Sequence, residues 1–140
     1  MLKKRLIAGM AACLMAVSAF SMSASAYGQE RMIARIYQGA TVSSNSAKKT
    51  ASGRFAVTPT PYGSDGWSSK GDEYVYFRGR TDSGEQATVL RRKSYNGTSS
   101  TEWINYLSGK ASVGSYYKVA IEYDNTNPYK YVDLIVTWVP

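Results

Sequence analysis

Histidine is absent from the 140 residues, and the chain has a single cysteine, Cys13. Without histidine, the protein lacks the most usual general base, the serine–histidine–aspartate triad and the commonest metal ligand. One cysteine forms neither an internal disulfide nor a zinc cluster. These absences argue against the most frequent catalytic and metal chemistries. We therefore expect a protein that is not an enzyme and has no catalytic residue, metal site or cofactor.

Acidic residues are also few, ten against 17 lysines and arginines. Most of them fall in turn-like segments, where aspartate ordinarily bonds its own backbone. A glycosidase needs two carboxylates that face each other about 5–10 Å apart, and no local spacing suggests such a pair. A hydrolase that uses carboxylates alone stays as a minor alternative. Asp124, Asn125 and Asn127 offer calcium-type oxygen ligands, but their composition is more typical of a turn.

The N-terminal 26 residues are typical of a secretory signal peptide. Lys3, Lys4 and Arg5 precede an apolar run over 6–20, and Ala24-Ser25-Ala26 provides small residues for cleavage. The run of about 15 residues is shorter than the ~20 that a membrane-spanning helix requires. We expect cleavage after Ala26 and secretion of residues 27–140 as one domain of net charge +4, with no transmembrane anchor.

The composition of residues 27–140 favours strands over helices. This segment has three leucines but nine valines, ten threonines and twelve tyrosines, which suit a half-buried pleated surface. Alternation of apolar and polar residues is clearest over 130–139 and 115–124, and the turn-rich link between them predicts a long antiparallel hairpin. Weaker alternation marks 31–37 and 54–58, while 102–107 is ambiguous between a strand and a helical turn.

A second hairpin is predicted from residues 73–80 and 87–92, joined by a turn at 82–85. Six to eight short strands with frequent turn signals indicate an all-β fold. The fold class that we expect is a small antiparallel two-sheet sandwich, Ig-like or jelly-roll-like, with a small β-barrel as the alternative.

Basic and aromatic residues gather on the second hairpin and predict an anion-binding surface. Alternate residues of a strand share a face, so Tyr74, Tyr76, Arg78 and Arg80 point the same way. If Thr81 pairs with Gln86, Arg91 and Lys93 join this face, whereas a register one residue different brings Arg92 there instead. The candidate ligand-binding residues are Trp67, Tyr74, Tyr76, Arg78, Arg80, Arg91, Arg92 and Lys93. The alternative interpretation is an ordinary solvated face whose cations oppose aggregation.

The three tryptophans divide by context. Trp138 lies on the apolar face of a predicted strand, and we expect it in the core together with Trp103. Trp67 lies in a loop rich in glycine and serine, where an exposed indole suggests carbohydrate stacking or partner contact. The alternative for Trp67 is that it folds back and closes one end of the sandwich.

Three C-terminal segments, 106–110, 114–118 and 136–140, together with the signal peptide resemble small uncharacterised secreted proteins of Gram-positive bacteria. The resemblance implies a compact secreted β-fold and no particular activity. In size and class alone the chain is similar to β-sandwich bacteriocins.

From these features we expect a secreted, non-enzymatic binding module that acts at the bacterial cell envelope or in the extracellular space. Its expected partner is an anionic cell-wall polymer, a glycan or a surface protein, and no nucleic acid is expected because the charge of +4 is modest. A secreted bacteriocin-like antimicrobial or toxin-like protein is the alternative.

Overall fold

The computed structural model describes residues 20–23, 29–61, 74–94, 99–124 and 131–140. The strands found there are β1 (Phe20–Ser23), β2 (Glu30–Tyr37), β3 (Thr41–Ser43), β4 (Ala47–Lys48), β5 (Phe55–Pro61), β6 (Tyr74–Thr81), β7 (Arg91–Ser94), β8 (Glu102–Ile104), β9 (Tyr116–Tyr123) and β10 (Tyr131–Val139). These parts of the chain contain no helix, and therefore none that could cross a membrane.

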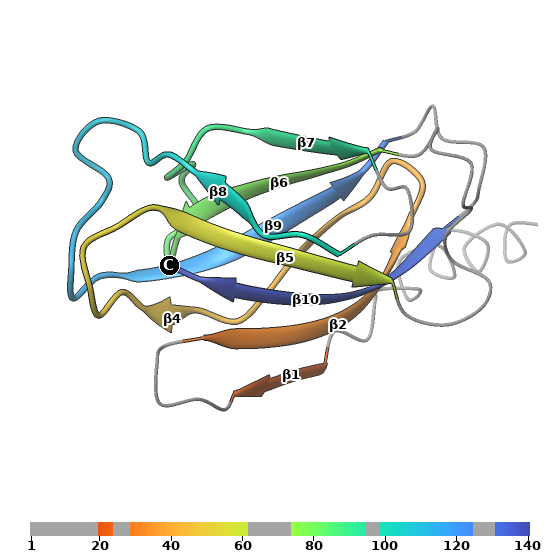
Figure 1. Cartoon of the computed structure of the whole chain (residues 1–140), viewed down its shortest axis with the longest axis horizontal. Helices are drawn as coiled ribbons and strands as arrows, with labels where there is room; N and C mark the ends of the chain where they lie inside the picture. Colours follow the sequence, from red (N-terminus) through yellow and green to blue (C-terminus); the bar gives the residue numbers. More distant parts are fainter. Residues whose placement is uncertain (1–19, 24–28, 62–73, 95–98, 125–130) are drawn as a thin grey trace, which may run out of the picture.

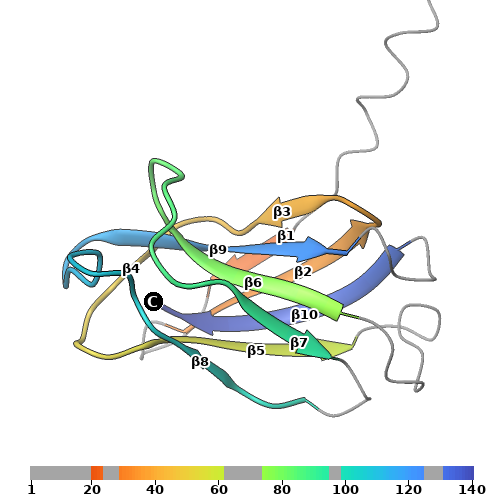
Figure 2. The ribbon, with the colours of Figure 1, turned by 90° about the horizontal axis from the view of Figure 1, so that it is seen from above.

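The strands form two antiparallel sheets that pack face to face (Figure 1). Sheet A has the order β1-β2-β10-β5-β8, and sheet B has the order β3-β9-β6-β7, with β4 also paired to β9. Figure 2 shows the edge strands β7 and β8 along one side of the molecule and β1 and β3 along the other. The predicted two-sheet sandwich is therefore confirmed, and the alternative of a barrel is wrong because the two sheets do not join.

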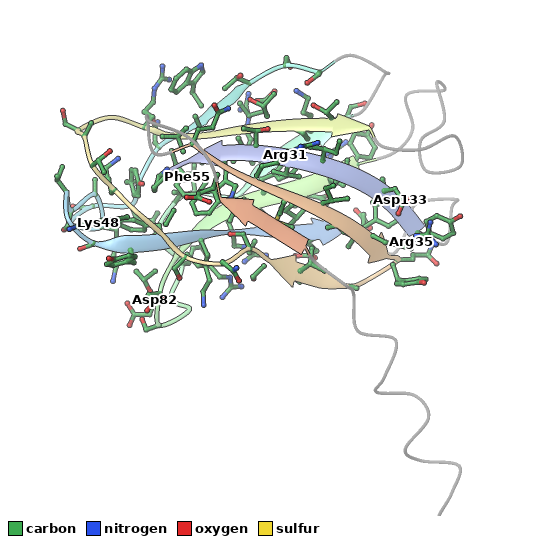
Figure 3. The ribbon with its side chains drawn as sticks, turned by 90° about the horizontal axis from the view of Figure 1, so that it is seen from below. Arg31, Arg35, Lys48, Phe55, Asp82 and Asp133 are labelled. Atoms are coloured by element: carbon green, nitrogen blue, oxygen red, sulfur yellow. The ribbon has the colours of Figure 1, made fainter. Side chains whose placement is uncertain are left out.

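The core lies between the sheets and is built by alternation along each long strand. In β10, Val132, Leu134, Val136 and Trp138 point inward and are buried, as the sequence predicts. The Phe55 ring stacks on Trp138 with centroids 5.6 Å apart, and it lies between the two layers in Figure 3. Such burial of apolar area supplies most of the driving force for folding, so the inward residues decide which way each strand faces.

The predicted hairpin between the last two long strands is wrong, although both strands exist. β9 belongs to sheet B and pairs with β3, β4 and β6, whereas β10 belongs to sheet A and pairs with β2 and β5. Each strand has an apolar face, and these faces meet across the core only if the strands lie in different sheets. The link over 125–130 lies outside the described residues.

The second predicted hairpin is present with a different register. Strands β6 and β7 pair Tyr76 with Arg92 and Phe77 with Arg91, whereas nearer the turn Arg80 bridges to Gln86. The change of register between these pairs arises at Gly79, whose carbonyl oxygen accepts hydrogen bonds from both Ala87 and Thr88. Between these pairs lie two residues of β6 (78–79) but four of the second strand (87–90), so the second strand carries a β-bulge of two extra residues. Strand β7 accordingly covers Arg91–Ser94 and not the predicted 87–92.

Position 79, beside this bulge, is occupied by glycine because the packing around it leaves no room for a side chain. A Cβ placed there would lie 2.7 Å from the Thr88 Cγ2 atom and 3.0 Å from the Phe55 ring. The Gly79 amide donates to the buried Thr88 hydroxyl over 2.8 Å, which holds the two segments together. The close approach of the Thr88 and Phe55 side chains therefore explains the glycine at this point in the strand.

The weaker predicted strands are also present. Residues 31–37 and 54–58 correspond to β2 and β5, and the ambiguous segment 102–107 contains the short strand β8. The strands β3 and β4 were not predicted, because strands of three and two residues are too short to display alternation. β1 lies within the segment that is predicted to be removed as a signal peptide, and it pairs with β2 at the edge of sheet A.

Candidate functional site

The outer surface of sheet B carries the predicted cluster of cations and tyrosines. Along β6, Tyr74, Tyr76, Arg78 and Arg80 are partly exposed, and the intervening residues are buried. This alternation confirms that the four residues share the outward face. We call the outer surface of β6, β7 and β9 the basic face, defined by Tyr74, Tyr76, Arg78, Arg80, Arg92, Tyr116 and Lys118.

The observed register decides which residues of β7 belong to the basic face. Arg92 lies opposite Tyr76 and points outward, with its Cζ atom 3.7 Å from the centre of the Tyr74 ring. Arg91 and Lys93 lie opposite Phe77 and Val75, whose side chains point toward the core. The prediction that Arg91 and Lys93 join the anion-binding face is therefore wrong, and the alternative register, which brings Arg92 there, is the one observed. The reason is that Arg80, and not Thr81, lies opposite Gln86 at the turn.

Arg91 and Lys93 instead link the two sheets along the β7–β8 side. The Lys93 Nζ atom donates to Glu102 over 3.1 Å and to the Ser100 carbonyl oxygen over 2.9 Å. Arg91 Nε donates to the other Glu102 carboxylate oxygen over 2.9 Å. Burial alone would raise the pKa of Glu102, but the hydrogen bonds from Arg91 and Lys93 outweigh burial and hold that pKa below its usual value.

Strand β9 adds residues to the basic face that sequence reasoning missed. Lys118 lies opposite Arg80 and Glu122 lies opposite Tyr76, while Tyr116 pairs with Lys48 on β4. The pairing of β6 with β9 brings together segments about 40 residues apart, so no local pattern could have found them. Figure 3 shows Lys48 at one end of this sheet, where Asp82 also lies.

Positive charge on the basic face is only partly neutralised. Of the ion pairs in the described part of the chain, one crosses this face, between Arg78 and Glu122 at 2.8 Å. Arg80 and Lys118 donate to the carbonyl oxygens of Gly84 and Asp82 over 2.7 and 2.9 Å. A carbonyl oxygen orients a cation without cancelling its charge, so Arg80, Arg92 and Lys118 leave this surface positive.

A shallow depression of about 240 Å³ lies beside these cations and is open to solvent. It is lined by Gly39, Tyr76, Leu90, Glu122 and Asp124. The Tyr76 hydroxyl donates to Asp124 over 3.1 Å, and burial together with this bond raises the pKa of Tyr76. The hydroxyl therefore stays protonated at neutral pH and remains a hydrogen-bond donor.

The carboxylates of the depression do not form the pair that a glycosidase requires. Glu122 and Asp124 are two residues apart along one chain segment, and each already accepts a hydrogen bond from the neighbouring strand, from Arg78 and Tyr76 respectively. Carboxylates on opposite sides of a sugar would need to face each other across a gap. Within the described residues, no group of three or more acidic or cysteine side chains could hold a metal ion.

The tryptophans differ from their predicted positions in one case. Trp138 is buried, as predicted, but Trp103 retains 55% exposure, so its prediction as a core residue is wrong. In β8 the inward position belongs to the next residue, Ile104, and the side chain of Trp103 therefore points out of sheet A. Trp67 lies outside the described residues, as do Asn125 and Asn127 of the calcium alternative.

A buried lysine at the end of the core was not predicted. Lys49 is 1% exposed, and its Nζ atom donates to the Gly53 carbonyl oxygen over 3.2 Å and lies 4.7 Å from the centre of the Tyr106 ring. Burial lowers the pKa of Lys49 and raises that of Tyr106. Because Lys49 is buried and Tyr106 packs against the buried residues of the core, we assign this pair to the core.

Comparison with known proteins adds no relative, since no family model, curated protein or solved structure matches the chain.

Proposed function

We propose that the chain is a secreted, non-enzymatic binding module that attaches to an anionic polymer of the bacterial cell envelope through its basic face. The observation that carries the proposal is the surplus of positive charge on the outer surface of sheet B. Arg80, Arg92 and Lys118 lie on three neighbouring strands, and none of them has a carboxylate partner within the described residues.

The geometry suits a long, flexible polyanion better than a small anion. Lys118 and Arg80 lie side by side on neighbouring strands, which are about 4.8 Å apart, whereas Arg92 lies opposite Tyr76, about 13 Å further along the strands. The cations are therefore spread over an open surface and do not line a closed pocket. A polymer with regularly repeated phosphate or carboxylate groups can contact several of them at once. Tyr74 and Tyr116 lie at the two ends of this surface and offer flat apolar area to the polymer backbone.

Secretion is part of the same proposal and rests on the signal-peptide pattern over residues 1–26. Removal of this segment would take β1 away and leave β2 as the edge strand of sheet A. The basic face is on the other sheet and would keep all its residues. Protein purified from the culture medium is therefore expected to begin at Tyr27 and to bind like the full fold.

The test is retention of the secreted protein on purified Gram-positive cell walls at increasing salt. We expect binding at low ionic strength that declines as salt rises, because screening weakens attraction between exposed charges. Arg80→Gln together with Arg92→Gln should weaken low-salt binding roughly tenfold. The control is Arg31→Gln with Arg54→Gln, which removes the same charge from the other sheet and should leave the salt-dependent binding unchanged.

Two results would contradict the proposal. One is the absence of retention even at low salt, and the other is equal binding by the two double variants. Growth inhibition of related strains by the purified protein, without wall binding, would favour the bacteriocin-like alternative.

A further inference from the structure

The outer surface of sheet A differs from the basic face and carries a tryptophan beside rows of hydroxyl groups. We call it the threonine face, defined by Trp103, Thr101, Thr58, Thr137, Thr60 and Ser99. We infer that the threonine face is a second binding site, at which a ring of a neutral polysaccharide stacks on Trp103 and bonds to the neighbouring hydroxyls. The inference goes beyond the proposed anion binding, because it concerns the opposite surface.

Trp103 is placed as a platform and not as a filler of the core. It is 55% exposed and pairs with Ala56 on β5, whose small side chain leaves the indole above the sheet. The Arg54 Cζ atom lies 5.5 Å from the centre of the Trp103 ring, close enough for a cation–π contact. An indole held in this way keeps flat apolar area open to solvent, which is the surface that the C–H face of a sugar ring contacts.

The hydroxyl groups form two short rows next to this platform. The first row runs across Thr101, Thr58 and Thr137, since Thr58 pairs with Thr137 and its hydroxyl lies 2.7 Å from that of Thr101. The second row has Thr60 and Ser99, whose hydroxyl oxygens are 2.9 Å apart. Each hydroxyl has one proton and two lone pairs, so these pairs still have capacity for the hydroxyls of a sugar.

The spacing of the rows fits an extended chain of sugars. Positions two residues apart along a strand are about 6.6 Å apart, and neighbouring strands are about 4.8 Å apart. A polysaccharide that has one ring on Trp103 can therefore place its next rings over the threonine rows. A sheet surface is also flat, which suits an extended polymer better than a single small sugar.

The indole and the hydroxyl groups of this surface, and not its charges, point to a neutral occupant. The positions nearest Trp103 are Ala56, Val139, the threonines and Arg54, with no carboxylate among them, and Arg31 lies opposite Thr137. The acidic residue of the same surface, Asp133, lies at the far end of β10, where Arg35 donates to it twice, over 2.8 and 2.7 Å (Figure 3). The threonine face thus binds through stacking and neutral hydrogen bonds, and its binding should persist at high salt, where the charges of Arg31 and Arg54 are screened.

The experiment measures retention of the protein on insoluble chitin and cellulose in 1 M NaCl, where ionic attraction reaches only about 3 Å. We expect the wild-type protein to bind at least one of these polysaccharides, and Trp103→Ala to bind it at least roughly tenfold more weakly, a loss of about 1.4 kcal/mol. Trp103→Phe should keep part of the binding, because it keeps an aromatic ring. Thr58→Val with Thr101→Val should weaken binding while preserving side-chain shape.

The matched control is Val113→Ala, an exposed residue (58%) outside the threonine face, which should bind like the wild type. Circular dichroism would confirm that each variant is folded. Absence of retention on both polysaccharides, or equal binding by Trp103→Ala and the wild type, would overturn the inference. Loss of this binding in the Arg80→Gln, Arg92→Gln variant would also overturn it, whereas wall binding at low salt tests the basic face separately.

Discussion

The two outer surfaces of the sandwich have the same backbone architecture and opposite chemistry. The basic face of sheet B presents Arg78, Arg80 and Lys118, whereas the threonine face of sheet A presents Trp103 and hydroxyl groups. Both surfaces alternate with the same kind of buried aliphatic and aromatic residues. The comparison teaches that the inward positions specify this fold, while the outward positions are free to differ and therefore carry the chemistry of binding.

The largest expected effect tests the close packing at Gly79, beside the bulged segment that precedes β7. Gly79→Ala should destabilise the protein by about 1–3 kcal/mol, because the new Cβ would lie 2.7 Å from Thr88 and 3.0 Å from Phe55. Denaturant unfolding measures the loss. The control Ser43→Ala, on an exposed position of β3, should change stability by less than ~0.5 kcal/mol. Equal stability of the two variants would mean that the close approach at Gly79 is not present.

The next effect separates the residues of β7 into structural and exposed ones. Lys93→Met should cost about 1–3 kcal/mol, because it removes a donor from the largely buried Glu102 carboxylate. Arg92→Met should change stability by no more than ~0.5 kcal/mol, because Arg92 points into solvent. Thermal or denaturant unfolding compares the two. The reverse order would restore the register predicted from the sequence, with Lys93 on the basic face.

The smallest effect concerns the pH dependence of the link between the sheets. The pKa of Glu102 is lower in the folded protein than its ordinary unfolded value of about 4.3. Its contribution to stability is therefore complete above that value and is lost as pH falls through the folded pKa. Wild type should be more stable than Glu102→Gln at pH 7, and the difference should shrink between pH 4 and pH 2.

Unfolding measured at several pH values checks this prediction. The control is Glu85→Gln, because the pKa of Glu85 is also lowered, by a hydrogen bond from Lys110, but this pair is exposed. Screening by solvent makes the Glu85 effect the smaller one. A difference between wild type and Glu102→Gln that stays constant from pH 7 to pH 2 would contradict the assignment.

Sequence patterns located most of the strands because alternation is a local property. The ranges over β2, β5, β6, β9 and β10 were recognised, and in β10 the buried face was identified residue by residue. The pairing of strands was recognised less well. β9 and β10 are neighbours in the chain but lie in different sheets, and a turn-rich link is compatible with either arrangement.

The candidate sites show the same division. The outward direction of Tyr74, Tyr76, Arg78 and Arg80 follows from the period of a strand and was predicted correctly. The position of Arg92 in place of Arg91 and Lys93 depends on the register at the turn, where Arg80 and not Thr81 lies opposite Gln86. The exposure of Trp103 could not be predicted, because the segment 102–107 is too short to show which of its two faces is buried.

The sequence by itself determined the class of fold and the inward face of each long strand, because burial of apolar area rewards a local period of two. Only the tertiary structure decided which strands are neighbours, which residues of β7 face solvent and that Lys118 joins Arg80 on one surface. These features depend on contacts between segments distant in the chain. Their free energy comes from packing of the whole sandwich, and no short stretch of sequence records it.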